Sequence, residues 1–216
     1  MTIAARASAK ATTGAKVAGI ACALLLLGLP TFEKALATDV VIVGDSIGEG
    51  IATSNGLRSV ARRNVSLVRS DVAGELRRIG KGAIAVMSLG LNDAGDPLTR
   101  LRKPIEKAIT AIEGTGVTVI WLGPPCVLTK LDGKVRDLDG YLQARLAGTP
   151  IRYISLRALG VCDKSLRAKD GIHYTFAGYK EIWTRLQPLT RPAAWSAEPE
   201  GSREGGVRTS STVSGG

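Results

Sequence analysis

Five short runs of apolar residues, each bounded by turn-forming residues, recur along the chain and constrain its fold more than any other feature. The runs are Val40 to Val43, Val65 to Val68, Ala83 to Leu89, Val117 to Leu122 and Ile151 to Leu156. Between them, apolar residues recur every three or four positions, as at Leu98, Leu101 and Ile105. This alternation predicts buried parallel strands connected by amphipathic helices. The expected fold class is α/β, a three-layer α/β/α sandwich around a flavodoxin-like five-stranded parallel sheet.

The amino terminus has the three parts of an export signal. Basic residues come first, the apolar stretch Val17 to Leu29 follows, and Ala35 and Ala37 place small residues at a cleavage site. The apolar stretch has 13 residues, too few to span a bilayer as a helix. The pattern predicts a signal peptide over residues 1–37 and a periplasmic or extracellular protein, with an uncleaved anchor as the alternative.

One domain is expected after cleavage, over residues 38–190, followed by a glycine- and serine-rich tail at 191–216 that should be disordered. Residues 1–37 hold four of the 29 basic and one of the 19 acidic residues, so the net charge would fall from +10 to +7. No basic block interleaved with aromatic residues occurs, and nucleic acid is therefore not expected as a partner. We also expect no membrane span and a monomeric protein.

Two cysteines remain in the predicted domain, Cys126 and Cys162. An oxidising compartment would allow them to form a disulfide, and two free buried thiols are the alternative. Neither cysteine is placed to act as a nucleophile. Metal-ligand clusters and a phosphate-binding glycine loop are absent from the sequence, so no metal and no cofactor is expected.

The candidate catalytic residues all follow predicted strands or precede the last predicted helix. His173 is the single histidine of the chain, and Asp170 lies three residues before it, where its carboxylate can orient the imidazole. Ser46 follows the first strand between glycines, at the edge where open α/β sheets bind ligands. Asn92 follows the strand at 83–89 and can donate to an oxyanion. Taken singly, each residue also has a structural interpretation: Ser46 as a helix N-cap, Asn92 as a turn residue and His173 as a packing residue.

Two other serine-hydrolase arrangements fit the residues around Ser46 less well. The segment Gly44 to Gly48 matches the G-x-S-x-G elbow of α/β-hydrolases, but that elbow follows several strands, whereas Ser46 follows the first. A trypsin-like protease has its histidine before its serine, whereas His173 comes 127 residues after Ser46.

Three sequence blocks taken together resemble those of the SGNH (GDSL-type) hydrolases. They are Gly44-Asp45-Ser46, Gly90-Leu91-Asn92-Asp93 and Asp170-Gly171-Ile172-His173, in this order and spread over nearly the whole predicted domain. The resemblance implies the SGNH hydrolase fold, with Ser46 as nucleophile and Asp170 and His173 completing the triad. It also implies an oxyanion hole formed by the Ser46 N–H and the Asn92 amide.

The third oxyanion donor of that family is the N–H of a glycine after the second strand, and the corresponding segment here, Arg69 to Gly74, departs from the pattern. Ser70 is the best-placed substitute because a serine keeps the backbone N–H, and Gly74 is the other candidate. Each such donor is typically worth about 2.7 to 4 kcal/mol of transition-state stabilisation.

The function implied by this resemblance is that of a secreted serine esterase that hydrolyses short-chain acyl esters through an acyl-enzyme. The substrate would be a small-molecule or glycan ester, with O-acetyl carbohydrate as one possibility. The alternatives are an O-acyltransferase that uses the same triad and a noncatalytic glycan-binding module on the same fold.

Overall fold

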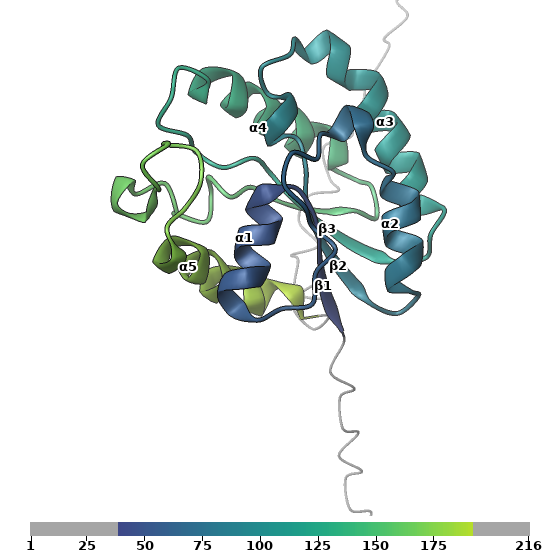
Figure 1. The fold of residues 1–216 in the computed structure, drawn as a ribbon. Coiled ribbons are helices and arrows are strands. Elements are labelled where there is room, and N and C mark those ends of the chain that lie inside the picture. The colour runs from purple at the N-terminus through teal and green to yellow at the C-terminus, as the bar shows by residue number, and fades with distance from the viewer. Residues whose placement is uncertain (1–38, 192–216) are drawn as a thin grey trace, which may run out of the picture. The chain divides into compact units, whose positions relative to one another are not determined.

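The computed structural model describes residues 39–191, which form a sheet covered by helices on both faces (Figure 1). The predicted export signal at 1–37 lies outside the described residues, as does the predicted tail apart from Arg191. The strands are β1 (Val40–Gly44), β2 (Ile84–Ser88), β3 (Thr118–Leu122) and β4 (Arg152–Ile154). The helices are α1 (Ser46–Asn55), α2 (Val72–Ile79), α3 (Leu98–Glu113), α4 (Asp132–Leu146) and α5 (Phe176–Leu186), with short 3₁₀ turns η1 (Leu67–Arg69), η2 (Leu91–Asp93), η3 (Lys164–Leu166) and η4 (Gln187–Thr190).

The four strands are all parallel and lie in the order β1-β2-β3-β4. Val41 lies opposite Ala85, Ala85 opposite Val119, and Trp121 opposite Tyr153. The α/β class and the parallel sheet predicted from the sequence are confirmed, whereas the described residues contain four strands rather than the expected five.

The predicted strand Val65 to Val68 is wrong. This segment contains the turn η1, and the N–H groups of Leu67 and Val68 bond to the Asp93 carboxylate instead of a neighbouring strand. The edge of the sheet beside β1 is occupied by residues 58–62, which bond to Ile42 and Gly44 on the side of β1 away from β2. This edge segment runs parallel to β1, so the chain keeps the flavodoxin-like order.

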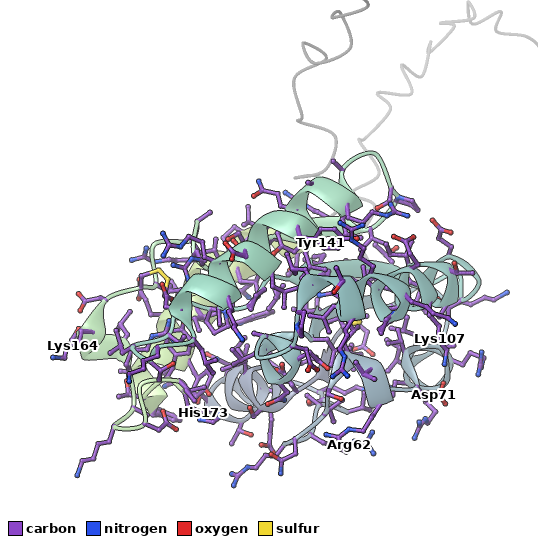
Figure 2. The ribbon with its side chains drawn as sticks, turned by 90° about the horizontal axis from the view of Figure 1, so that it is seen from above. Arg62, Asp71, Lys107, Tyr141, Lys164 and His173 are labelled. Atoms are coloured by element: carbon purple, nitrogen blue, oxygen red, sulfur yellow. A yellow bond between two sulfur atoms is a disulfide. The ribbon has the colours of Figure 1, made fainter. Side chains whose placement is uncertain are left out.

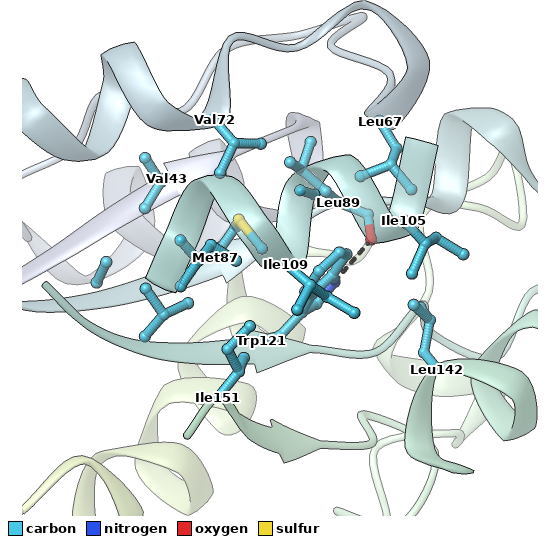
Figure 3. Packing of buried hydrophobic residues seen from close by; sticks show 14 of the residues in the cluster. Val43, Leu67, Val72, Met87, Leu89, Ile105, Ile109, Trp121, Leu142 and Ile151 are labelled. Atoms are coloured by element: carbon cyan, nitrogen blue, oxygen red, sulfur yellow. Dashed lines mark hydrogen bonds between the residues drawn. The ribbon is translucent and has the colours of Figure 1, made fainter. Parts of the chain in front are cut away.

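Alternation along the strands divides the core into two layers. Val41, Val43 and their neighbours of the same parity pack against α2, α3 and α4 (Figure 3). Ile42 and its counterparts on β2, β3 and β4 pack against α1 and α5. Because strand side chains point alternately to opposite faces, runs in which every residue is apolar are buried on both. The result is the expected three-layer sandwich.

The largest fully buried side chain, Trp121, lies at the centre of the first layer. Its indole N–H donates to the Leu89 carbonyl at 3.2 Å, as the dashed line in Figure 3 shows. A buried indole N–H without an acceptor would cost about 1–3 kcal/mol. This bond therefore holds the carboxyl end of β2, where the segment that carries Asn92 begins.

Candidate active site

Ser46 is placed by a sharp turn at the end of β1. Gly44 has φ of +109°, and a Cβ there would lie 1.9 Å from the Ser88 carbonyl oxygen, so only glycine fits. Asp45 is the N-cap of α1, and its Oδ1 accepts from the Ile47 N–H at 3.0 Å. The N-cap interpretation of Ser46 is thus wrong. Ser46 is the first residue of α1, and its N–H is one that an α-helix leaves without a partner and directs toward an anion.

Asp45 is itself fully buried beneath this turn. Its Oδ1 also accepts from the Ser88 hydroxyl at 2.8 Å, while its Oδ2 has no hydrogen-bond partner among the described residues. Burial, which disfavours the charged form, raises the pKa of the Asp45 carboxyl to about 6. The carboxyl that orients the start of α1 therefore ionises close to pH 6, far above the range of an ordinary aspartate.

Ser46, His173 and Asp170 form a continuous chain of hydrogen bonds. The Ser46 Oγ lies 2.9 Å from His173 Nε2, and His173 Nδ1 lies 2.7 Å from Asp170 Oδ2. The other oxygen of Asp170 accepts from the N–H groups of Ile172 and His173 at 2.8 and 2.9 Å. The bond to His173 is the main reason that the pKa of Asp170 falls to about 2, so this carboxylate is ionised at neutral pH.

The loop that carries His173 is supported by residues that the sequence analysis did not identify. Arg167 is buried, donates to the Ile172 carbonyl at 3.1 Å, and stacks its guanidinium 3.6 Å from the centre of the Tyr174 ring. The Leu128 N–H donates to the Gly171 carbonyl at 2.7 Å, which joins the loop after β3 to the histidine loop. No sequence signal marks these contacts, because a buried arginine and a backbone bond between distant loops depend on tertiary packing.

The loop after β3 is itself held by a disulfide. Cys126 and Cys162 are bonded, with their Cα atoms 5.4 Å apart, so the disulfide interpretation of the sequence is the one that the structure supports. Cys126 is two residues before Leu128, and the disulfide therefore fixes the strand-to-helix connection that contacts the histidine loop. Asp132, at the start of α4, makes a two-pronged ion pair with Arg157 at 2.8 and 3.1 Å and strengthens the same connection.

The predicted oxyanion residues Asn92 and Ser70 lie on two turns that are bonded to each other. The Asn92 amide donates to the Val65 carbonyl at 2.8 Å, and the nearby Asp93 carboxylate accepts from the Leu67 N–H at 2.6 Å. Gly74 is excluded as a donor, since its N–H caps α2 by bonding to Asp71 Oδ1 at 3.0 Å. Of Ser70 and Gly74, Ser70 therefore remains the candidate for the third oxyanion donor.

The triad opens into a cavity of about 500 Å³. Arg63 and Glu49 form an ion pair at 2.9 Å on its wall, and Phe176 is 62% exposed at its rim. Ser70 instead lines a second cavity of about 640 Å³ between the 67–73 segment and α3, and Figure 2 shows two residues of that cavity, Asp71 and Lys107, apart from His173. The triad cavity is lined by Ser46, Glu49, Gly50, Thr53, Ser54, Arg63, Asp170, His173, Tyr174, Phe176 and Tyr179.

Residues 39–191 contain neither a membrane-spanning helix nor a cluster of metal ligands. No helix there is long and apolar enough to cross a membrane. No group of three or more histidine, cysteine or acidic side chains in that range is placed to hold a metal ion.

Comparison with known proteins shows similarity at the level of the fold. No family model matches the chain, and no curated protein is similar to it in sequence. A lipolytic protein of the G-D-S-L family from Veillonella parvula is 18% identical over 71% of this chain and 98% of its own, with a TM-score of 0.54. A GDSL-like lipase from Bacteroides thetaiotaomicron is 17% identical over 71% of this chain and 88% of its own, with a TM-score of 0.59. A carbohydrate esterase family 3 protein from Talaromyces cellulolyticus is 14% identical over 70% of this chain and 95% of its own, with a TM-score of 0.56.

At these identities the likeness establishes a common architecture, and it covers most of residues 39–191. The resemblance inferred from the three sequence blocks is confirmed in this respect.

Proposed function

We propose, from the premise that this chain has the fold of the SGNH hydrolases, that it is a serine esterase that hydrolyses short-chain acyl esters. The observation that carries the proposal is the chain of hydrogen bonds from Ser46 Oγ through the His173 ring to Asp170, at 2.9 and 2.7 Å. Fold alone implies no activity, whereas a nucleophile, a base and an orienting carboxylate in contact match the requirements of acyl transfer.

In the first half of the reaction, His173 Nε2 accepts the Ser46 proton as Oγ attacks the ester carbonyl, and Asp170 stabilises the resulting imidazolium. The proposed oxyanion donors are the Ser46 N–H at the start of α1 and the Asn92 amide, with the backbone N–H of Ser70 as a third donor even though Ser70 also lines the second cavity. Collapse of the tetrahedral intermediate transfers the proton from His173 to the departing alkoxide and leaves Ser46 acylated.

In the second half, water attacks the acyl-enzyme and His173 accepts its proton. The side chains of His173 and Asp170 are 39% and 48% exposed, so solvent reaches the acyl-enzyme directly. The same openness supports a short acyl group, because long chains are held in deep apolar tunnels that shield them from water. A glycan ester is the leaving-group class that we favour, consistent with the carbohydrate esterase among the similar structures and with the predicted export signal.

The proposal is tested by labelling the full chain with a fluorophosphonate probe and by following hydrolysis of p-nitrophenyl acetate and octanoate. We expect one adduct, at Ser46, that is lost on prior denaturation, and a preference for acetate. Ser46→Ala and His173→Ala should each lower kcat by about 10⁴-fold or more. Ser165→Ala, in the exposed turn η3, is the matched serine control and should retain wild-type activity.

Full activity in a folded His173→Ala variant would contradict the mechanism, because the chain has no second histidine that could replace it. Absence of an adduct in the folded wild-type protein would remove the nucleophile assignment.

A further inference from the structure

The large apolar side chains that are exposed within residues 39–191 all lie at the carboxyl edge of the sheet, spread along it from the 67–73 segment to the start of α5. They are Val68, Leu128, Leu131 and Phe176, with 52%, 47%, 39% and 62% of their surfaces exposed. Val68, Leu128 and Leu131 belong to connections that follow a parallel strand or the parallel edge segment, and Phe176 begins the helix that follows such a connection. These connections meet at the carboxyl edge. Ser46 and His173 open at the same edge. Exposed apolar residues scattered singly need no explanation, but a set confined to one edge indicates a contact surface.

Cations accompany these apolar residues. Arg69 follows Val68 directly, and Lys130 lies between Leu128 and Leu131. Lys180 places its Nζ 4.8 Å above the centre of the Phe176 ring. Neither Arg69 nor Lys130 has an acidic partner within salt-bridge distance in the described part of the chain.

The carboxylates near this edge are already engaged. Glu49 pairs with Arg63, Asp132 with Arg157 and Asp170 with His173, while Asp71 and Asp163 accept backbone N–H groups at helix starts. The cations that flank the apolar residues therefore remain available for an external anion, and the chain as a whole carries a net charge of +10.

We infer that this edge docks on an anionic lipid membrane. The docking surface consists of Val68, Leu128, Leu131 and Phe176, together with the adjacent cations Arg69, Lys130 and Lys180. Apolar side chains enter the boundary between headgroups and acyl chains, and the cations remain among the lipid phosphates. An acidic polysaccharide would satisfy the cations but would leave the exposed leucines and phenylalanine in water. A bilayer surface provides partners for the cations and an apolar environment for the leucines and the phenylalanine. Docking there would turn the opening of the Ser46 cavity toward the membrane.

A local probe tests the docking without interference from residues 1–37, which have an apolar stretch of their own. In the full chain, Phe176→Trp adds an indole at the proposed surface, and vesicles of phosphatidylcholine with brominated phosphatidylglycerol quench an indole that enters them. Ala147→Trp, at the exposed end of α4 that precedes β4, is the matched control at the opposite edge of the sheet. Fluorescence is compared in each case with that of the wild-type chain.

We expect quenching of the added indole in Phe176→Trp and none in Ala147→Trp. Raised salt should weaken the quenching of Phe176→Trp because it screens the cations. Replacing the anionic lipid by phosphatidylcholine should also weaken it, because the cations then lose their partners. Adding Leu128→Ser and Leu131→Ser should lower the affinity for the vesicles, measured by quenching, by at least about tenfold, since two leucine side chains no longer enter the lipid.

The inference is wrong if the Phe176→Trp indole is not quenched by anionic vesicles, or if the two serine substitutions do not change its quenching. Equal quenching at Ala147→Trp would also overturn it, as would retention on an acidic polysaccharide without lipid quenching. Ser46→Ala should dock as the parent does, so failure of the docking and failure of the esterase proposal are distinguished.

Discussion

The fully buried Asp45 makes the stability of this protein depend on pH in a direction opposite to that of most aspartates. Burial raises its pKa to about 6 in the folded protein, compared with 3.8 for an ordinary aspartate. A group whose pKa is raised by folding stabilises the folded state below its unfolded pKa, and this contribution is lost as pH rises through the folded pKa. The wild-type protein should therefore lose stability from this carboxyl as it ionises.

The size of this stability change follows from the linkage between protonation and folding. At about 1.36 kcal/mol per pKa unit, the change from 3.8 to about 6 corresponds to about 3 kcal/mol between strongly acidic and neutral conditions. Between about pH 5 and pH 7, where most other carboxyls are already ionised, the loss attributable to Asp45 is on the order of 1 kcal/mol. Full burial means that solvent screening does not reduce this figure.

Asp45→Asn removes the ionisation and keeps the hydrogen bonds. The asparagine Oδ1 can accept from the Ile47 N–H and the Ser88 hydroxyl as the carboxylate does, and its amide nitrogen takes the place of an oxygen that has no partner among the described residues. Urea unfolding at a series of pH values should show that the difference in unfolding free energy between variant and wild type shifts by about 1 kcal/mol in favour of the variant from about pH 5 to pH 7.

Ser88→Ala gives the opposite result. The Ser88 hydroxyl bond lowers the pKa of Asp45, so its removal should raise that pKa further and steepen the loss of stability with pH. A difference between Asp45→Asn and wild type that does not change with pH would refute the assignment of a buried, titrating Asp45.

Three further predictions follow from the loops around the triad. Replacing both Cys126 and Cys162 with alanine should lower the unfolding free energy by about 4 kcal/mol, measured by urea denaturation, because the unfolded chain loses a cross-link over 36 residues. Asp93→Ala should cost about 1–3 kcal/mol in the same assay by leaving a buried N–H without its acceptor. Gly171→Ala should lower kcat by about 100-fold in ester hydrolysis with little change in KM. Gly171 has φ of +69°, and a Cβ there would lie 3.1 Å from the Leu128 Cβ, so the histidine loop would have to shift. An unchanged kcat would contradict this reasoning.

The sequence predicted the elements whose hydrogen bonds and burial are local or periodic. The runs at β1, β2 and β3 are apolar at nearly every position because both faces of the sheet are covered, and that pattern is visible in the residues alone. At β4, which reads Arg-Tyr-Ile, the run is carried by the apolar residues around Arg152 and Tyr153. Residues 58–62 were missed because an edge segment with one neighbour needs no apolar run. Val65 to Val68 was misassigned because it is a short apolar run, but the N–H groups of Leu67 and Val68 bond to Asp93, which is 25 residues or more away in sequence.

The candidate site shows the same difference between features set by local sequence and features set by tertiary packing. The positions of Ser46, Asp170 and His173 could be predicted because each lies beside a turn with a recognisable sequence. The contributions of Arg167 and Leu128 could not, because a buried guanidinium stacked on an aromatic ring and a backbone bond between two loops depend on how the loops pack together. Nothing in the local sequence specifies either contact.

An aspartate organises each of the three sequence blocks. Asp45 accepts the Ile47 N–H and thereby leaves Ser46 as the first residue of α1, with its own N–H free for an oxyanion. Asp93 accepts two N–H groups of the turn that precedes Ser70. Asp170 binds the His173 backbone with one oxygen and its ring with the other.

In each block the carboxylate thus sets the backbone conformation that presents a neighbouring functional group. A short aspartate side chain can reach N–H groups two or three residues away, whereas the longer glutamate would need a different loop. For Asp45 and Asp170, which bond to N–H groups two or three residues on, aspartate therefore has a conformational reason, and in Asp170 that reason coincides with the chemistry. Asp93 instead joins two turns that are 25 residues or more apart in sequence. Replacing Asp170 with asparagine should then preserve the loop, through an Oδ1 that still accepts both N–H groups, while kcat for ester hydrolysis falls steeply because the imidazolium loses its counter-charge. If kcat were unchanged in a folded Asp170→Asn variant, the role of this aspartate would be conformational only.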